Sequence, residues 1–164
     1  MSEWTMQTFD CLTDAKSAAR QAEKTCFLCH PDAPANTFTL FSRGGACILI
    51  QDYDSGIQPA VMDFGSTIWV RTNFCFMCLD AKLNLLNSTP VLAPVYDFLY
   101  SPASDCVIAV CEIDIFCLTM QGDLLWHKAL DDILSEYALT GNMLSYTLFE
   151  GKACSLDITT AKPV

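Results

Sequence analysis

The sequence predicts a mainly β fold made of antiparallel hairpins. Short apolar and β-branched runs recur from Thr37 onward, and turn clusters such as Arg43-Gly44-Gly45 and Gln121-Gly122-Asp123 separate them. The segments between the runs are too short to hold the crossover helices that parallel strands require. Hairpins therefore explain the pattern better than βαβ units.

Ten short segments carry this strand pattern. Most are separated from the next by only a few residues, which favours tight hairpin turns. The predicted strands are residues 37–42, 46–52, 67–71, 74–80, 95–100, 106–111, 114–120, 123–127, 143–149 and 153–158.

Two short helices are predicted beside the strands. Residues 13–24 are rich in alanine and begin with side chains that are favoured at helix N-caps. Residues 130–137 place four apolar side chains on one helical face, and Gly141 follows as a stop signal. These four side chains are Leu130, Ile133, Leu134 and Tyr137. We therefore expect a short N-terminal helix and one helix near 130–137.

We expect a single domain over residues 1–164, with residues 1–36 as a helix and loop lead-in and residues 37–164 as the β-hairpin body. A chain of 164 residues with 52% hydrophobic residues can bury enough surface to fold without a metal or a disulfide. No apolar run reaches the ~20 residues of a membrane-spanning helix, and the first residues lack the apolar core of a secretion signal. The expected location is cytoplasmic, with no membrane partner.

The β-hairpin body contains an internal repeat. Residues 66–86 align with residues 105–125 at a shift of about 39 residues. Residues 144–164 repeat the order of strand, tight turn, strand and Leu-Asp. A repeat of this length is typical of a blade-like hairpin unit.

Part of the repeat resembles a known family. Residues 107–112 (VIAVCE) and residues 115–126 (IFCLTMQGDLLW) resemble one repeat of a quinoprotein-type or WD-like β-propeller, and residues 155–162 resemble a turn of the next repeat. The resemblance extends over residues 66–164. At ~40 residues for each blade, it implies that about four blades fit in the chain. The expected fold is therefore a blade-like sandwich or partial propeller, and no cofactor site is implied.

The charge distribution favours a positively charged partner. The net charge is −10, and the stretch from Leu83 to Gly151 holds nine acidic residues but one basic residue, Lys128. Such a surface repels nucleic-acid phosphates and attracts basic proteins. A solvated surface without a partner is the alternative explanation of the same acidity. The expected partner-binding residues are Asp105, Asp123, Asp131, Asp132 and Glu136.

The ten cysteines are mostly embedded in apolar runs, and we interpret these as small, reduced, buried side chains. Two C-x-x-C pairs, Cys26 with Cys29 and Cys75 with Cys78, could supply the four ligands of a structural zinc site. Against this, 45 residues separate the pairs, and on a strand Cys75 and Cys78 point to opposite faces. A zinc-stabilised interaction module is therefore an alternative rather than the favoured interpretation.

No catalytic motif accompanies these features. The two histidines, His30 and His127, belong to neither a G-x-S-x-G nor an H-E-x-x-H motif. The favoured function is a non-enzymatic, acidic protein-binding protein without a cofactor, such as an immunity protein or antitoxin that neutralises a basic toxin domain. An enzyme whose site is dispersed along the sequence is a further alternative.

Overall fold

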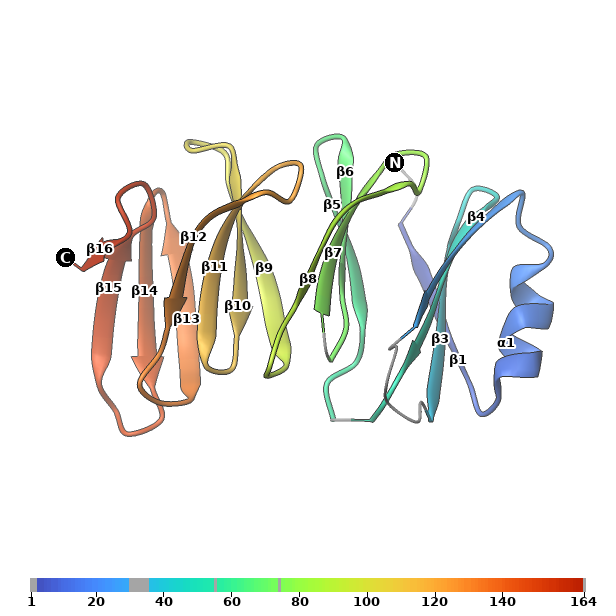
Figure 1. Ribbon diagram of the computed structural model, residues 1–164, viewed down its shortest axis with the longest axis horizontal. Helices are drawn as coiled ribbons and strands as arrows, with labels where there is room; N and C mark the ends of the chain where they lie inside the picture. The colour runs from blue at the N-terminus through green and yellow to red at the C-terminus, as the bar shows by residue number, and fades with distance from the viewer. Residues whose placement is uncertain (1–2, 30–35, 55, 74, 164) are drawn as a thin grey trace.

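The computed structural model describes residues 3–29, 36–54, 56–73 and 75–163 and confirms the mainly β architecture. Within these residues, sixteen strands form four sheets of four strands each, accompanied by one helix, α1 (Leu12–Ala19). The sheets lie side by side in a row, with α1 at one end and the C-terminus at the other (Figure 1). No helix in the part of the chain described is long and apolar enough to cross a membrane.

The second, third and fourth sheets are meanders, in which each strand pairs antiparallel with the next. The second contains β5 (Ala60–Phe64), β6 (Thr67–Arg71), β7 (Cys75–Asp80) and β8 (Leu85–Pro90). The third contains β9 (Val95–Ser101), β10 (Cys106–Cys111), β11 (Asp114–Thr119) and β12 (Leu124–Ala129). The fourth contains β13 (Leu134–Thr140), β14 (Met143–Leu148), β15 (Ala153–Asp157) and β16 (Lys162–Pro163). The antiparallel hairpins that the closely spaced turns predicted are present, although β5, β8, β13 and β16 were not among the predicted strands.

The first sheet has a different topology. Its spatial order is β1 (Thr5–Phe9), β3 (Thr37–Arg43), β4 (Ala46–Asp52) and β2 (Lys24–Cys29). Strand β2 lies parallel to β4, and α1 connects β1 to β2 along the chain. Residues 1–36, expected as a helix and loop, thus contribute two strands. The helix predicted over residues 13–24 ends at Ala19, because the chain then turns to pair with β4.

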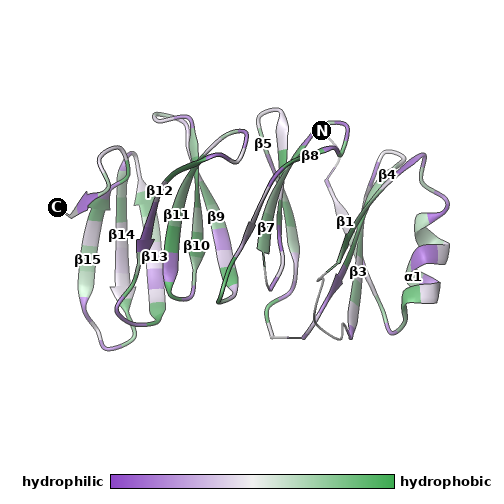
Figure 2. Cartoon of the chain, in the orientation of Figure 1, coloured by the Kyte–Doolittle hydropathy of each residue, from purple (hydrophilic) through white to green (hydrophobic). Residues whose placement is uncertain are grey.

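Apolar side chains fill the three spaces between neighbouring sheets. Successive residues of a strand point to opposite faces, so one central strand contributes to two of these layers. In β6, Ile68 packs against the first sheet and Trp69 packs against the third. In β10, Val107 packs against the second sheet and Ile108 against the fourth. Strands β10 and β11 are accordingly hydrophobic along most of their length (Figure 2).

Helix α1 covers the outer face of the first sheet. Its buried side chains, Ala15 and Ala19, pack with Leu40 and Leu49 of the sheet. A helix of eight residues is marginal in isolation, so packing on the sheet must provide most of its stability. The alanines carry no bulk beyond Cβ, which suits a helix that lies close to a sheet.

The prediction of a helix near residues 130–137 is wrong. Residues 130–133 form a loop, and β13 begins at Leu134 and pairs with β14. From Glu136 to Thr140, exposed and half-buried residues alternate, as on a strand. A helix of eight residues is only marginally stable by itself. Pairing with β14 instead satisfies the hydrogen-bonding groups of the β13 backbone.

The internal repeat is visible at three turns. The side-chain oxygens of Asp80, Thr119 and Asp157 each accept a hydrogen bond from the backbone N–H two residues later. Each turn then contains one residue with a positive φ. These residues are Leu83 (59°), Gly122 (89°) and Ala161 (58°). The positive φ falls three residues after Asp80 and Thr119 and four after Asp157, so the third turn is one residue longer than the other two.

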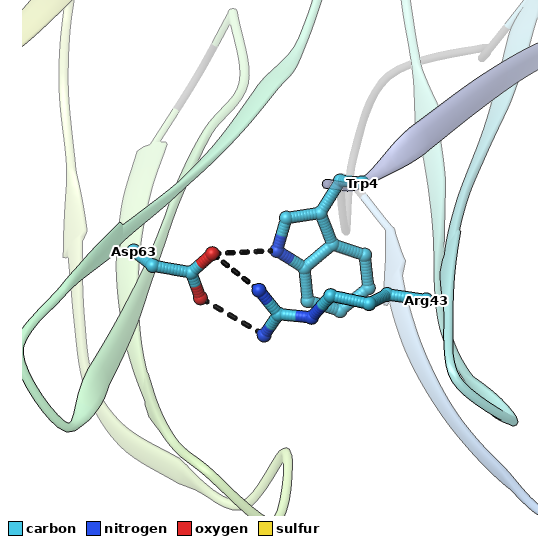
Figure 3. A network of polar contacts seen from close by, with 3 residues as sticks. All are labelled: Trp4, Arg43 and Asp63. Carbon is cyan, nitrogen blue, oxygen red and sulfur yellow. Dashed lines mark hydrogen bonds and ion pairs between the residues drawn. The ribbon is translucent and has the colours of Figure 1, made fainter. Parts of the chain in front are cut away.

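A polar network joins the first sheet to the second (Figure 3). The Arg43 guanidinium donates two hydrogen bonds to the Asp63 carboxylate, and its Nη2 lies 2.9 Å from Oδ1. The indole Nε1 of Trp4 donates to Asp63 Oδ2 at 3.2 Å. The guanidinium carbon lies 4.2 Å from the centre of the Trp4 ring, a cation–π contact. Three segments that are distant in sequence are held together here.

Candidate functional site: the lower turn surface

Four turns lie together at the lower edge of the second, third and fourth sheets in Figure 1. Each follows an even-numbered strand, and in antiparallel meanders such turns fall at the same edge. We call these turns, residues 90–95, 111–114, 129–134 and 148–153, the lower turn surface.

Main-chain hydrogen bonds join each of these turns to the next. The N–H of Glu112 donates to the carbonyl oxygen of Pro94 at 3.0 Å, and the N–H of Leu134 donates to that of Glu112 at 2.8 Å. The N–H of Phe149 donates to the carbonyl oxygen of Ile133 at 2.7 Å. Turns fixed in this way have little entropy left to lose when a partner binds.

Asp132 adds a side-chain connection between two of the turns. Its carboxylate accepts hydrogen bonds from the N–H of Ile133 at 2.7 Å and the N–H of Glu150 at 3.0 Å. The second bond crosses from the β12–β13 turn to the β14–β15 turn. Asp132 therefore supports the shape of the surface as well as its charge.

Three large apolar side chains are exposed on these turns. The exposed fraction is 97% for Leu92, 75% for Phe149 and 40% for Ile133. They come from three different turns, and stacked sheets are spaced about 10 Å apart. The three side chains therefore extend across the lower edge rather than lying at a single point. Large apolar side chains exposed on neighbouring turns make this edge a candidate interaction surface.

Carboxylates dominate the charge of the lower turn surface. Its five acidic residues face a single cationic residue, Lys152. The five are Glu112, Asp114, Asp131, Asp132 and Glu150, of which Asp114 is buried and pairs with His127. Lys152 Nζ lies 3.6 Å from Asp131 Oδ2, but both side chains are largely exposed, so water screens this ion pair. The surface therefore combines apolar side chains with a local excess of negative charge.

The residues predicted to bind a partner are divided between two edges of the molecule. Asp131 and Asp132 lie on the lower turn surface, and Glu136 is exposed on β13 close to it. Asp105 and Asp123 lie on turns at the opposite edge (Figure 1). Strands of six or seven residues put these edges roughly 20 Å apart. The structure thus brings together only the residues near 131–136.

The two acids at the upper edge have local partners. The Tyr100 hydroxyl donates to Asp105 Oδ1 at 3.2 Å, and the Asn87 side-chain amide donates to Asp123 Oδ1 at 3.4 Å. Burial, with a contribution from Asp105, raises the pKa of Tyr100. Both acids therefore take part in hydrogen bonds within the protein.

Phe149 and Glu112 were not predicted as functional residues. Phe149 ends an apolar run that was interpreted as strand 143–149, but β14 ends at Leu148 and leaves the Phe149 ring in solvent. The signal that could have identified it is its position directly before Glu150-Gly151. Glu112 lies in the β10–β11 turn and is joined to the other turns by main-chain hydrogen bonds, which one sequence does not display.

His127 pairs with Asp114 near this surface. Its Nε2 lies 2.6 Å from Asp114 Oδ1, and its ring stacks on Phe116 with centroids 4.5 Å apart. Two hollows lie nearby, of about 690 and 350 Å³, and His127 lines neither of them. His127 thus contacts Asp114 and Phe116 within the third sheet. The other histidine, His30, lies outside the described residues.

The four cysteines of the C-x-x-C pairs are not assembled into one site. Cys75 belongs to the apolar layer between the first and second sheets, and Cys78 to the next layer, as strand alternation predicts. Burial raises the pKa of both thiols, that of Cys78 to about 11. Within the described ranges, no group of three or more His, Cys, Asp or Glu side chains could hold a metal ion.

Six of the ten cysteines are buried, which confirms their interpretation as small apolar side chains. Two more are half-buried, and Cys11 and Cys29 are exposed. Burial raises the pKa of Cys106, Cys111 and Cys117, which keeps these thiols protonated and unreactive.

The stacked four-stranded meanders define a propeller-like class of fold, and comparison with known proteins agrees. No family model and no curated protein matches the chain. The computationally designed Ika4 protein is similar over 67% of this chain and 73% of its own, with 13% identity and a TM-score of 0.55. The Cps50 (Swd1) β-propeller domain of Myceliophteria thermophila is similar over 64% of this chain and 38% of its own, with 11% identity and a TM-score of 0.50.

A third similar structure is the WD40 domain of Neurospora crassa Pan2. It matches 65% of this chain and 36% of its own, with 13% identity and a TM-score of 0.50. The chain thus spans less than two fifths of each of the two natural domains. At such identities the likeness shows the fold alone, and it confirms the resemblance to WD-like propeller repeats.

Proposed function

We propose that this chain is a non-enzymatic protein-binding protein that uses the lower turn surface to bind a positively charged partner. The observation that carries the proposal is the row of exposed Leu92, Ile133 and Phe149 among the carboxylates of Glu112, Asp131, Asp132 and Glu150. A large aromatic side chain is a frequent source of binding energy at an interface. The carboxylates would accelerate encounter with a basic partner and fix its orientation.

In its most specific form, the proposal is an immunity protein or antitoxin that neutralises a basic toxin domain. Blocking a toxin requires a rigid, complementary surface and no chemistry, which suits hydrogen-bonded turns. Asp131 and Glu136 would contact the partner, and Asp105 and Asp123 would contribute to long-range attraction from the opposite edge. The unpaired, mostly buried thiols support a reducing, cytoplasmic location.

The test is capture of binding partners with matched variants. We expect Phe149→Ala to weaken the captured complex at least tenfold, because it removes the largest exposed anchor. Asp131→Lys combined with Glu150→Lys should weaken it further and reduce its sensitivity to salt. Each variant changes exposed side chains on turns, so the fold should be unaffected.

The matched control is Asp123→Lys, a charge reversal at the upper edge. It should leave the dissociation rate unchanged and lower the association rate slightly. The proposal fails if Asp123→Lys weakens the complex as much as the lower-edge variants. It also fails if binding is unaffected by Phe149→Ala or insensitive to salt.

A further inference from the structure

A second surface feature, unrelated to the lower turn surface, lies between α1 and β2. It is a hollow of about 340 Å³ at the end of the molecule that carries the helix. Its lining residues are Lys16, Ala19, Arg20, Thr25, Phe27 and Leu49. Ala19 and Leu49 are buried and form an apolar floor, and Phe27 is 43% exposed and forms a wall.

Two cationic side chains stand at the rim of this hollow. Lys16 and Arg20 are four residues apart and therefore lie on the same side of the helix. Lys16 Nζ lies 5.2 Å from the centre of the Phe27 ring. Among the residues that the structure describes, no carboxylate forms an ion pair with either cation.

The charge at this site is opposite to that of the protein as a whole. The net charge is −10, yet three of the nine Lys and Arg residues fall within residues 16–24. Lys24 donates to the Asn84 side chain, so Lys16 and Arg20 are the cations available at the hollow. The Thr25 hydroxyl donates to the Ala19 carbonyl oxygen at 3.3 Å, and it adds little further polarity.

We propose that this hollow binds a small amphipathic carboxylate. The apolar body would lie against Ala19, Leu49 and Phe27, and the carboxylate would accept hydrogen bonds from Lys16 and Arg20. The hollow is open to solvent, and its volume of about 340 Å³ is enough to hold a single ring or a short alkyl chain. The site is independent of the proposed protein-binding function, because it uses none of the same residues.

The experiment is a titration of the folded chain with 3-phenylpropionate, followed by two-dimensional NMR. A ligand of this size should bind with a dissociation constant on the order of 1 mM. Saturable shifts should appear in α1 and β2. The uncharged analogue 3-phenylpropionamide should bind at least fivefold more weakly, because it lacks the carboxylate.

Two sets of variants distinguish specific binding at this hollow from nonspecific binding to the protein surface. Lys16→Gln combined with Arg20→Gln should weaken 3-phenylpropionate at least fivefold, while Lys82→Gln, which changes a lysine elsewhere, should leave it unchanged. Equal binding of acid and amide, or shifts confined to other sheets, would overturn the proposal. An absence of saturable shifts in α1 and β2 would overturn it as well.

Discussion

The two end sheets of this molecule deal with their outer faces in opposite ways. The outer face of the first sheet is apolar, and α1 covers its buried Phe38, Leu40 and Leu49. The outer face of the fourth sheet carries small and polar side chains, including exposed Ala138 and Ser145, and no helix packs on it among the described residues.

This difference shows two solutions to one problem. A row of stacked sheets is apolar on both faces in its middle, so each end needs either a cover or a face that tolerates water. At the first sheet, stability depends on eight helical residues and two buried alanines. At the fourth sheet, the face itself is compatible with solvent. The same substitution should therefore have very different effects at the two ends.

The largest expected effect comes from a charge placed under the helix. Ala19 is 5% exposed, so Ala19→Glu must bury an unpaired carboxylate or detach α1, and it should lower the free energy of unfolding by about 3 kcal/mol or more. Ala138→Glu on the exposed face should change it by less than about 0.5 kcal/mol. Urea denaturation measures both. Equal losses would contradict the distinction between the two ends.

Thiol reactivity should report the same contrast. Cys47 is 1% exposed beneath α1, whereas Cys154 is half-buried in the fourth sheet and lines its hollows. Alkylation with iodoacetamide, followed by mass spectrometry, should modify Cys154 about 100-fold faster, because Cys47 reacts only when α1 opens. In Ala19→Glu, Cys47 should react much faster. Equal rates in the unmodified chain would show that α1 does not protect the first sheet.

Substitutions at the contacts between each end sheet and its neighbouring sheet should have a smaller effect on stability. Asp63→Asn removes the charge that Arg43 and Trp4 share between the first and second sheets, and should cost about 1 kcal/mol. At the other end, the Trp126 indole donates to the Ile158 carbonyl oxygen at 2.8 Å, a neutral contact. High salt should therefore reduce the effect of Asp63→Asn but leave that of Trp126→Phe unchanged. Thermal denaturation with and without 1 M salt measures the loss of stability in each variant.

The fold could be predicted where strands are buried on both faces. β6, β7, β10 and β11 have continuous apolar runs, and the sequence shows them plainly. The edge strands β9 and β12 of the third sheet were predicted, but others, such as β1 and β8, were missed because they pack little. β1 is exposed at four of its five positions, and β8 alternates exposed and half-buried residues that include Asn87 and Pro90. Their pairing is set by the neighbouring strand rather than by their own pattern.

The candidate site was predictable only in part for a related reason. Asp131 and Asp132 are adjacent in sequence, so their charge is visible without a structure. Glu112 and Phe149 join them through hydrogen bonds between turns that lie far apart in the chain. The mistaken prediction of a helix near residues 130–137 has the same cause. Apolar spacing in eight residues does not reveal that β14 is available for pairing.

The smallest expected effect concerns a turn of the fourth sheet. Ala161 has a φ of 58°, a conformation that costs a residue with a Cβ about 1 kcal/mol and costs glycine almost nothing. Because its side chain is exposed, Ala161→Gly should raise the free energy of unfolding by about 0.5 kcal/mol, after allowance for the greater freedom of glycine in the unfolded chain. Leu83 has nearly the same φ in the second sheet but is 6% exposed and packs in the apolar layer. Leu83→Gly should therefore destabilise by about 2 kcal/mol or more, since the lost packing outweighs the relieved strain. Urea denaturation measures both. If both substitutions stabilised the protein, the turn at Leu83 would depend on packing no more than the turn at Ala161 in the fourth sheet.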